Sequence, residues 1–115
     1  MSIPVQLEDL ARVVEGYGSA LLVTIGQPLR IKVHTVDPLV RDGALVIAMR
    51  GRGSAVNLAA NPQATVVWMP LERHGYTLIV DGNGVPTEDG VMVFPESAML
   101  HRPAGHADGP ASTYP

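Results

Sequence analysis

The chain has 115 residues, 46% of them hydrophobic, with a formal net charge of −3 and no cysteine. This length predicts one domain around one core, and the negative charge argues against nucleic acid as a partner, because phosphate backbones attract cationic proteins. The lack of cysteine excludes disulfides and thiolate metal sites, and no apolar run approaches the roughly 20 residues that span a bilayer, so we expect a cytoplasmic protein without a membrane partner.

The first predicted element is an amphipathic helix. Apolar residues recur at helical spacing in the first part of the chain, which predicts a helix that starts near Pro4 and ends at Gly16 or Gly18. The apolar run 19–26 then predicts a strand, and a turn follows it at residues 26–28.

Residues 29–36 alternate between apolar and polar side chains, which predicts a half-buried strand. We expect one face of this strand to be polar, with Arg30, Lys32 and His34, and the other to be apolar, with Leu29, Ile31, Val33 and Thr35. The Asp42–Gly43 pair predicts a tight turn that joins this strand to the apolar run 44–49 as a hairpin.

The second half of the chain predicts a short helix and three more strands. Ser54 is a good N-cap residue, and Asn61–Pro62 is a stop signal, so a helix is expected between them. Strands are expected at residues 64–70, 76–85 and 91–95, with a bend at 81–84 and a helical turn at 97–102.

These elements predict an all-β protein with two or three short helices. Six strands that follow one another through turns favour an antiparallel closed or partly closed barrel. The composition shifts to Pro, Gly, Ala and Ser late in the chain, so we predict a single domain over residues 1–102 and a flexible tail over 103–115. The high hydrophobic content predicts leftover apolar surface, which a homodimer would cover.

The loop Arg50–Gly51–Arg52–Gly53, between a strand and a helix N-terminus, is the strongest functional signal. Free N–H groups, the positive end of the helix dipole and cationic side chains would together suit a phosphate group. The alternative is a surface turn with solvated arginines. The loop is not a dinucleotide fingerprint, because Val56 stands at the third glycine position.

The distribution of cations favours the phosphate interpretation. The chain has only eight Lys and Arg residues, and four of them lie in the two segments expected to pair as a hairpin, at Arg30, Lys32, Arg50 and Arg52. Positive charge concentrated on an acidic protein favours a specific anion, although a basic stripe is also typical of a solvent face. The four histidines show no metal-ligand spacing, so we expect no metal site.

The order and spacing of these segments over residues 7–102 resemble the pyridoxamine 5'-phosphate oxidase-like proteins, the FMN-binding split barrels, and especially their short actinobacterial members. The segments that carry the resemblance are ALLVTIG, LRIKVHTV, DGALVIAMRGRGS, NLAANPQATVVW and YTLIVDGNG. The resemblance implies a six-stranded Greek-key split barrel and a homodimer with FMN at its interface. It also implies a flavin-dependent oxidoreductase that acts on a small-molecule substrate.

The resemblance further implies which residues hold the cofactor. Lys32 takes the basic position of the second strand, the loop before the helix supplies further cations, and the second subunit contributes from its fifth strand. We expect no obligatory catalytic side chain, because the flavin carries the redox chemistry. The predicted cofactor-binding residues are Lys32, His34, Thr35, Ala48, Met49, Arg50, Arg52, Gly53, Ser54, Asn57, Tyr76 and Thr77.

Two alternatives to an FMN-dependent enzyme stay open. Related split barrels use the deazaflavin F420, haem or no demonstrated cofactor, so the same barrel would also suit F420 or a non-catalytic ligand-binding role. Many relatives carry Arg-Lys or a single Lys where this chain has Gly53–Ser54. The chain also ends before the C-terminal substrate-binding segment of authentic pyridoxamine phosphate oxidases.

Overall fold

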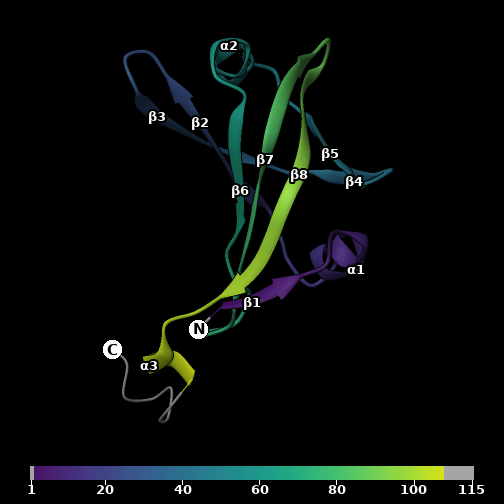
Figure 1. Ribbon diagram of the computed structural model, residues 1–115, viewed down its shortest axis with the longest axis vertical. Coiled ribbons are helices and arrows are strands. Elements are labelled where there is room, and N and C mark those ends of the chain that lie inside the picture. The colour runs from purple at the N-terminus through teal and green to yellow at the C-terminus, as the bar shows by residue number, and fades with distance from the viewer. Residues whose placement is uncertain (1, 108–115) are drawn as a thin grey trace.

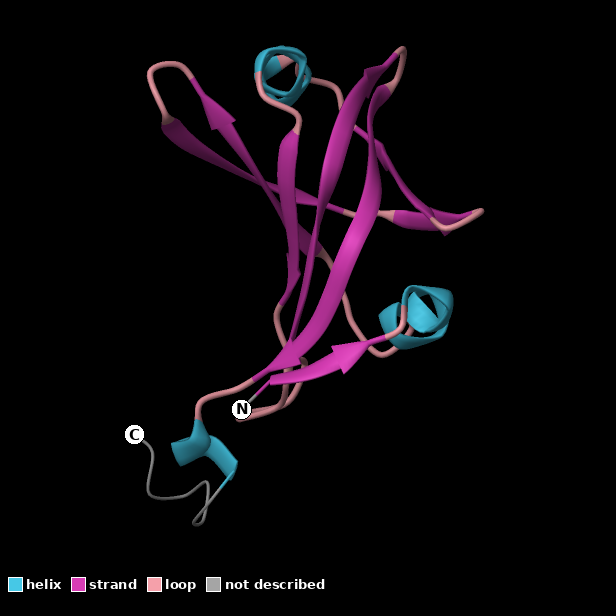
Figure 2. Ribbon diagram, in the orientation of Figure 1, coloured by secondary structure: helices cyan, strands magenta, loops and turns pink. Residues whose placement is uncertain are grey.

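The computed structural model describes residues 2–107, which form one antiparallel sheet with short helices around it (Figures 1 and 2). The helices are the 3-10 turn η1 (Leu7–Asp9), α1 (Leu10–Val14), α2 (Gly53–Ala60) and α3 (Ala104–Ala107). The strands are β1 (Ser2–Val5), β2 (Ala20–Gly26), β3 (Arg30–Val36), β4 (Leu39–Arg41), β5 (Ala44–Ala48), β6 (Gln63–Trp68), β7 (Thr77–Thr87) and β8 (Gly90–His101).

The strands follow the order β3-β2-β6-β7-β8-β5-β4, and β1 pairs with the end of β8. Within the described residues the hydrogen bonding does not close this sheet into a ring, because β3 and β4 remain its two edges. The all-β, antiparallel prediction is confirmed. The six predicted strands correspond to β2, β3, β5, β6, β7 and β8, and the two short strands β1 and β4 are additional.

The core joins the buried face of the sheet to both α1 and α2, which contribute Leu10 and Leu58. Trp68 of β6 is almost completely buried, and Leu22, Val66, Leu78 and Val80 of the neighbouring strands are fully buried around it. Figure 1 shows α2 at one end of the long strands, between the β2–β3 hairpin and the β7–β8 hairpin.

The prediction for the N-terminus is only half right. A helix does form, but it begins at Leu7 as η1 and continues as α1, whereas Ser2–Val5 is a strand. The reason is the length of β8, which continues to His101 and offers β1 a free edge to pair with. The helical turn predicted at residues 97–102 is wrong for the same reason, because β8 occupies most of it.

The hairpin predicted around Asp42–Gly43 has the right turn but the wrong first strand. Both turn residues have positive φ angles, 50° and 79°, as a tight hairpin requires. Their flanking strands are β4 and β5, and within the described residues β3 pairs only with β2. Pro38 separates β3 from β4, because it has no N–H to donate and restricts the preceding residue.

The apolar face of β3 is exposed, which contradicts the predicted half-buried strand. Ile31 is 66% and Val33 54% accessible, whereas His34 on the opposite face is half-buried. The helix α2 packs mainly on β2 and β7. It reaches β3 on the polar face, where Ser54 contacts His34. The outer surface of the sheet therefore presents apolar side chains.

The predicted bend at residues 81–84 is confirmed. The register between β7 and β8 shifts between Asp81 and Gly82, where Glu96 has no partner and forms a bulge. At the other end of the chain, α3 forms inside the predicted tail, and the rest of that tail lies outside the described residues. None of the described helices is both long and apolar enough to cross a membrane.

Candidate functional site

A cavity of about 270 Å³ lies where β3, the end of β5 and the start of α2 meet. It brings together six of the residues predicted from the sequence, which come from two separate parts of the chain, residues 34–35 and 48–53. The residues that line it are His34, Thr35, Ala48, Met49, Arg50, Gly51 and Gly53. Gly51, which was not among the predicted residues, also lines the cavity.

Backbone and side-chain hydrogen bonds hold the loop that forms one wall of this cavity. The N–H of Met49 donates to the carbonyl of Asp89 over 2.9 Å. Arg52 extends toward the same β7–β8 hairpin, where its Nη1 donates to the carbonyl of Thr87 over 3.2 Å. Arg52 is thus turned away from the cavity that Arg50 lines, so the two arginines of the predicted phosphate loop have different roles.

Ser54 does not cap the helix as predicted. The helix α2 begins one residue earlier, Arg52 holds the N-cap position, and no side-chain cap hydrogen bond forms. Ser54 is fully buried, and its Oγ lies 3.0 Å from Nδ1 of His34 on β3. The hydroxyl group therefore joins the helix to the cavity wall instead of closing the helix end.

Lys32 and Asn57 belong to the same region but do not line the cavity. Nδ2 of Asn57 donates to Oγ1 of Thr24 over 3.1 Å, which ties α2 to β2. Lys32 lies opposite Thr24 in the β2–β3 pairing, on the same face of β3 as His34, and is exposed.

Tyr76 and Thr77 lie at the opposite end of β7 from α2 and do not reach this cavity (Figure 1). The hydroxyl of Tyr17 donates to the carbonyl of Tyr76 over 2.9 Å, and the guanidinium of Arg102 stacks 4.2 Å from the Tyr76 ring centre. A contribution from these residues to the same site would have to come from a second subunit.

Near Tyr76, the rings of His74 and His106 stack with their centres 4.0 Å apart, which attaches α3 to the loop before β7. Burial of the ring, followed by the charges of His106 and Arg73, lowers the pKa of His74 from its ordinary value of 6.5. A lowered folded-state pKa means that the unfolded chain binds the proton more readily. The stability from this contact is therefore complete above pH 6.5 and is lost as the pH falls through the lowered pKa.

We accordingly expect His74 to titrate below an unfolded-chain histidine when its ring protons are followed by NMR. In His106→Ala, removal of the second ring should raise the pKa of His74 toward its ordinary value. A His74 titration that is identical in both proteins would show that the stacked pair is not coupled.

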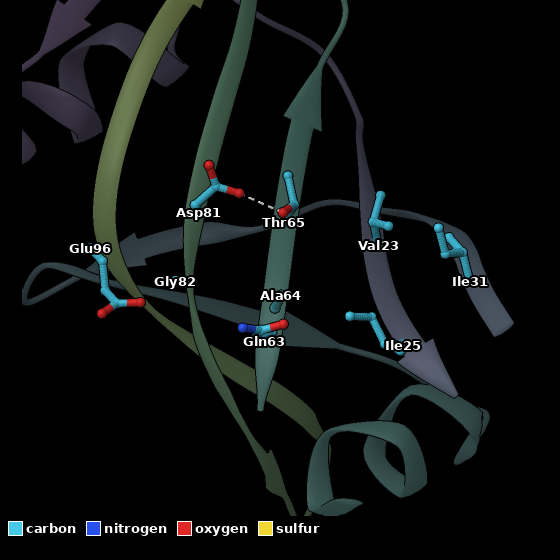
Figure 3. A pocket seen from close by; sticks show the side chains of 9 residues that line it. All are labelled: Val23, Ile25, Ile31, Gln63, Ala64, Thr65, Asp81, Gly82 and Glu96. Atoms are coloured by element: carbon cyan, nitrogen blue, oxygen red, sulfur yellow. Dashed lines mark hydrogen bonds between the residues drawn. The ribbon is translucent and has the colours of Figure 1, made fainter. Parts of the chain in front are cut away.

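A second cavity, of about 410 Å³, lies on the outer face of the sheet and was not predicted from the sequence (Figure 3). Apolar side chains form one side, and polar ones the other, where Oγ1 of Thr65 donates to Oδ1 of Asp81 over 2.5 Å. It is lined by Val23, Ile25, Ile31, Gln63, Ala64, Thr65, Asp81, Gly82 and Glu96. This larger cavity continues the exposed apolar surface of β3 and lacks cationic groups, so the smaller cavity is the better candidate for an anionic ligand.

No group of three or more His, Asp or Glu residues that could hold a metal ion occurs among residues 2–107. The candidate site is thus defined by cationic groups, backbone N–H groups at the start of α2 and a half-buried imidazole.

Comparison with solved structures places this architecture in a known class. The FAD binding protein from Mycobacterium smegmatis superposes with a TM-score of 0.59 at 14% identity, over 89% of this chain and 100% of that chain. A candidate pyridoxamine 5'-phosphate oxidase from Corynebacterium glutamicum superposes with a TM-score of 0.60 at 9% identity, over 88% and 93% of the two chains. The fold is that of the pyridoxamine 5'-phosphate oxidase-like split barrels.

Sequence comparison adds relatives without a described activity. Uncharacterized proteins of Mycobacterium bovis and Mycobacterium tuberculosis are each 29% identical over 116 aligned residues, which cover 87% of this chain and 82% of theirs. No family model matches the chain.

Proposed function

We propose that the cavity between β3, β5 and α2 binds FMN and that the protein is a flavin-dependent oxidoreductase acting on a small molecule. The observation that carries this proposal is the convergence of six residues, predicted as flavin ligands and located in two separate parts of the chain, on one cavity. The split-barrel fold, which is shared with an FAD binding protein, supports it.

The residues present suit a phosphorylated flavin. The first N–H groups of α2 have no partner within the helix, and together with the helix dipole they favour an anion at Gly53. Arg50, which is exposed at the cavity, supplies a full positive charge. Ala48 and Met49 offer apolar surface to a planar ring. Bound flavin would supply the hydride and electron chemistry, while the protein binds and orients it.

We further propose that two copies of the chain form a homodimer through the outer face of the sheet. Exposed Ile31 and Val33 continue into half-buried Val23 and Ile25 on the paired strand β2, which gives an apolar surface across neighbouring strands. Contiguous apolar surface of this kind is typical of association sites. A dimer would also allow Tyr76 and Thr77 of the second copy to approach the flavin.

The proposal is tested by titrating the purified protein with FMN and with riboflavin, which lacks the phosphate. We expect FMN to bind to the wild type. Arg50→Ala should weaken FMN affinity by about 10- to 100-fold, which corresponds to the loss of one charged hydrogen bond, and should change riboflavin affinity little. Arg41→Ala, which removes the same charge from the exposed end of β4, is the matched control and should leave FMN affinity unchanged. Arg52→Ala should have a smaller effect than Arg50→Ala, because Arg52 bonds to Thr87.

Other outcomes separate the alternatives. Binding of F420 in place of FMN would change the cofactor but keep the site. Tight FMN binding without reduction by a nicotinamide or any tested substrate would make the protein a ligand binder and contradict the enzymatic part. A wild-type protein that binds none of FMN, FAD and F420 would overturn the proposed function.

A further inference from the structure

The described part of the chain buries two polar side chains completely, and each of them meets a polar group from another element. Thr24 of β2 accepts the hydrogen bond from Asn57, and Ser54 of α2 contacts Nδ1 of His34. Buried polar groups without a partner cost roughly 1–3 kcal/mol, so these contacts constrain how α2 sits on the β2–β3 hairpin. Only the second of them touches a residue that lines the candidate site.

The contact with Ser54 favours one position for the proton on the neutral His34 ring. A neutral imidazole has one N–H donor and one acceptor nitrogen, and a serine hydroxyl has one hydrogen to donate. His34 Nδ1 is the partner of the buried Ser54 hydroxyl. If Nδ1–H donated to Oγ, the buried hydroxyl hydrogen would need a second acceptor, whereas donation from Oγ to Nδ1 satisfies both groups with this one contact. Nε2 must then carry the hydrogen, and it is the ring nitrogen left for a ligand in the cavity that His34 lines.

We infer that Ser54 is a positioning residue that holds His34 as an Nε2–H donor for an oxygen atom of the bound ligand. This inference rests on the proposed function for the nature of that ligand, a flavin whose ring carbonyls and phosphate both offer acceptor oxygens. The buried serine would thus add a directed neutral donor to a site that otherwise relies on Arg50 and the start of α2.

The first test uses the ligand-free protein, so that it is independent of flavin binding. Ring nitrogen chemical shifts, measured by NMR at a pH where His34 is neutral, distinguish the two tautomers. We expect the Nε2–H form in the wild type and a mixture of tautomers in Ser54→Ala. A predominant Nδ1–H form in the wild type, or an unchanged tautomer in Ser54→Ala, would overturn the inference.

The second test measures FMN affinity with matched variants. Ser54→Ala should weaken FMN affinity by about three- to tenfold, as expected for the loss of one hydrogen bond. Thr24→Val breaks the other buried polar contact of α2, the one with β2, without touching His34. If Thr24→Val weakens FMN affinity as much as Ser54→Ala does, the placement of α2 accounts for the loss of affinity and the inference fails.

Two replacements of His34 itself complete the design and do not depend on how Ser54→Ala folds. A glutamine amide falls near the position of Nε2, and an asparagine amide falls near Nδ1. His34→Gln should therefore keep FMN affinity within about threefold of the wild type, whereas His34→Asn should lose about tenfold. The reverse order would contradict a donor at Nε2. If the wild type binds no flavin at all, the proposed function fails, and the tautomer measurement still decides the role of Ser54.

Discussion

Replacing Val33 with aspartate should convert the proposed dimer to a monomer. Val33 is 54% accessible on β3, and its Cα pairs with that of Val23 on β2, so it lies within the exposed apolar face. In a two-fold dimer each copy contributes the same surface, so one substitution places two carboxylates in the interface. The cost of desolvating them, together with the lost apolar contact, should raise the dimer dissociation constant by about 100-fold or more.

Light scattering coupled to size-exclusion chromatography measures this directly, over a range of loading concentrations. Val56→Asp is the matched control, because Val56 is 65% accessible but lies on α2, away from the outer face of the sheet. It should leave the mass at twice that of the chain. A wild-type monomer, or a Val33→Asp protein that stays dimeric, would rule out this interface.

The same variant connects association with the candidate site. If a second copy supplies Tyr76 and Thr77 to the flavin, Val33→Asp should also weaken FMN affinity, although Val33 does not line the cavity. An unchanged FMN affinity in a monomeric Val33→Asp protein would show that one copy forms the complete site.

The exposed face of β3 also shows what the sequence could and could not predict. Alternation over residues 29–36 correctly indicates a strand with two unlike faces, because side chains of a strand point to opposite sides. It does not indicate which face is covered, since that depends on α2, which lies about twenty residues away in the sequence. Here the polar face lies toward the helix and the apolar face is open, with Ile31 66% accessible.

The pairing between strands was harder to predict than the position of each strand in the sequence. The run 44–49 and the Asp42–Gly43 turn were recognised from local signals, but the pairing of β5 with β4 depends on Pro38, which breaks the preceding strand. Likewise Ser2–Val5 carries no strong strand pattern, and its pairing arises from the free edge of β8. Long-range pairing of this kind leaves little trace in local periodicity.

The candidate site was predicted in outline but not in its internal contacts. The loop between a strand and a helix N-terminus was recognisable, because glycines predict a turn, arginines predict an anion site, and Asn61–Pro62 predicts the end of a helix from neighbouring residues alone. The hydrogen bond between Ser54 and His34, which are 20 positions apart in the sequence, could not be recognised in this way. Serine before an apolar run usually indicates a cap, and only the packing of α2 on β3 shows that its hydroxyl points elsewhere.

Gly82→Ala should be among the most destabilising single substitutions in this chain. A Cβ atom built on Gly82 would lie 2.3 Å from the carbonyl oxygen of Phe94 and 3.0 Å from Cα of Pro95, on the paired strand β8. These are main-chain atoms, so no side chain can move to make room. The position coincides with the register shift between β7 and β8, where the bulge at Glu96 brings the two backbones together.

We expect Gly82→Ala to lower the free energy of unfolding by about 3 kcal/mol, because relief of the overlap requires the long β7–β8 pair to separate locally. Since small domains are stable by only about 5–15 kcal/mol, this loss would be large. Chemical denaturation of the variant measures it, with Gly51→Ala as the matched control, because a Cβ on Gly51 would meet no atom within 4 Å. A Gly82→Ala protein within about 1 kcal/mol of the wild type would mean that the two strands yield at the bulge, and that glycine is not required for their close approach.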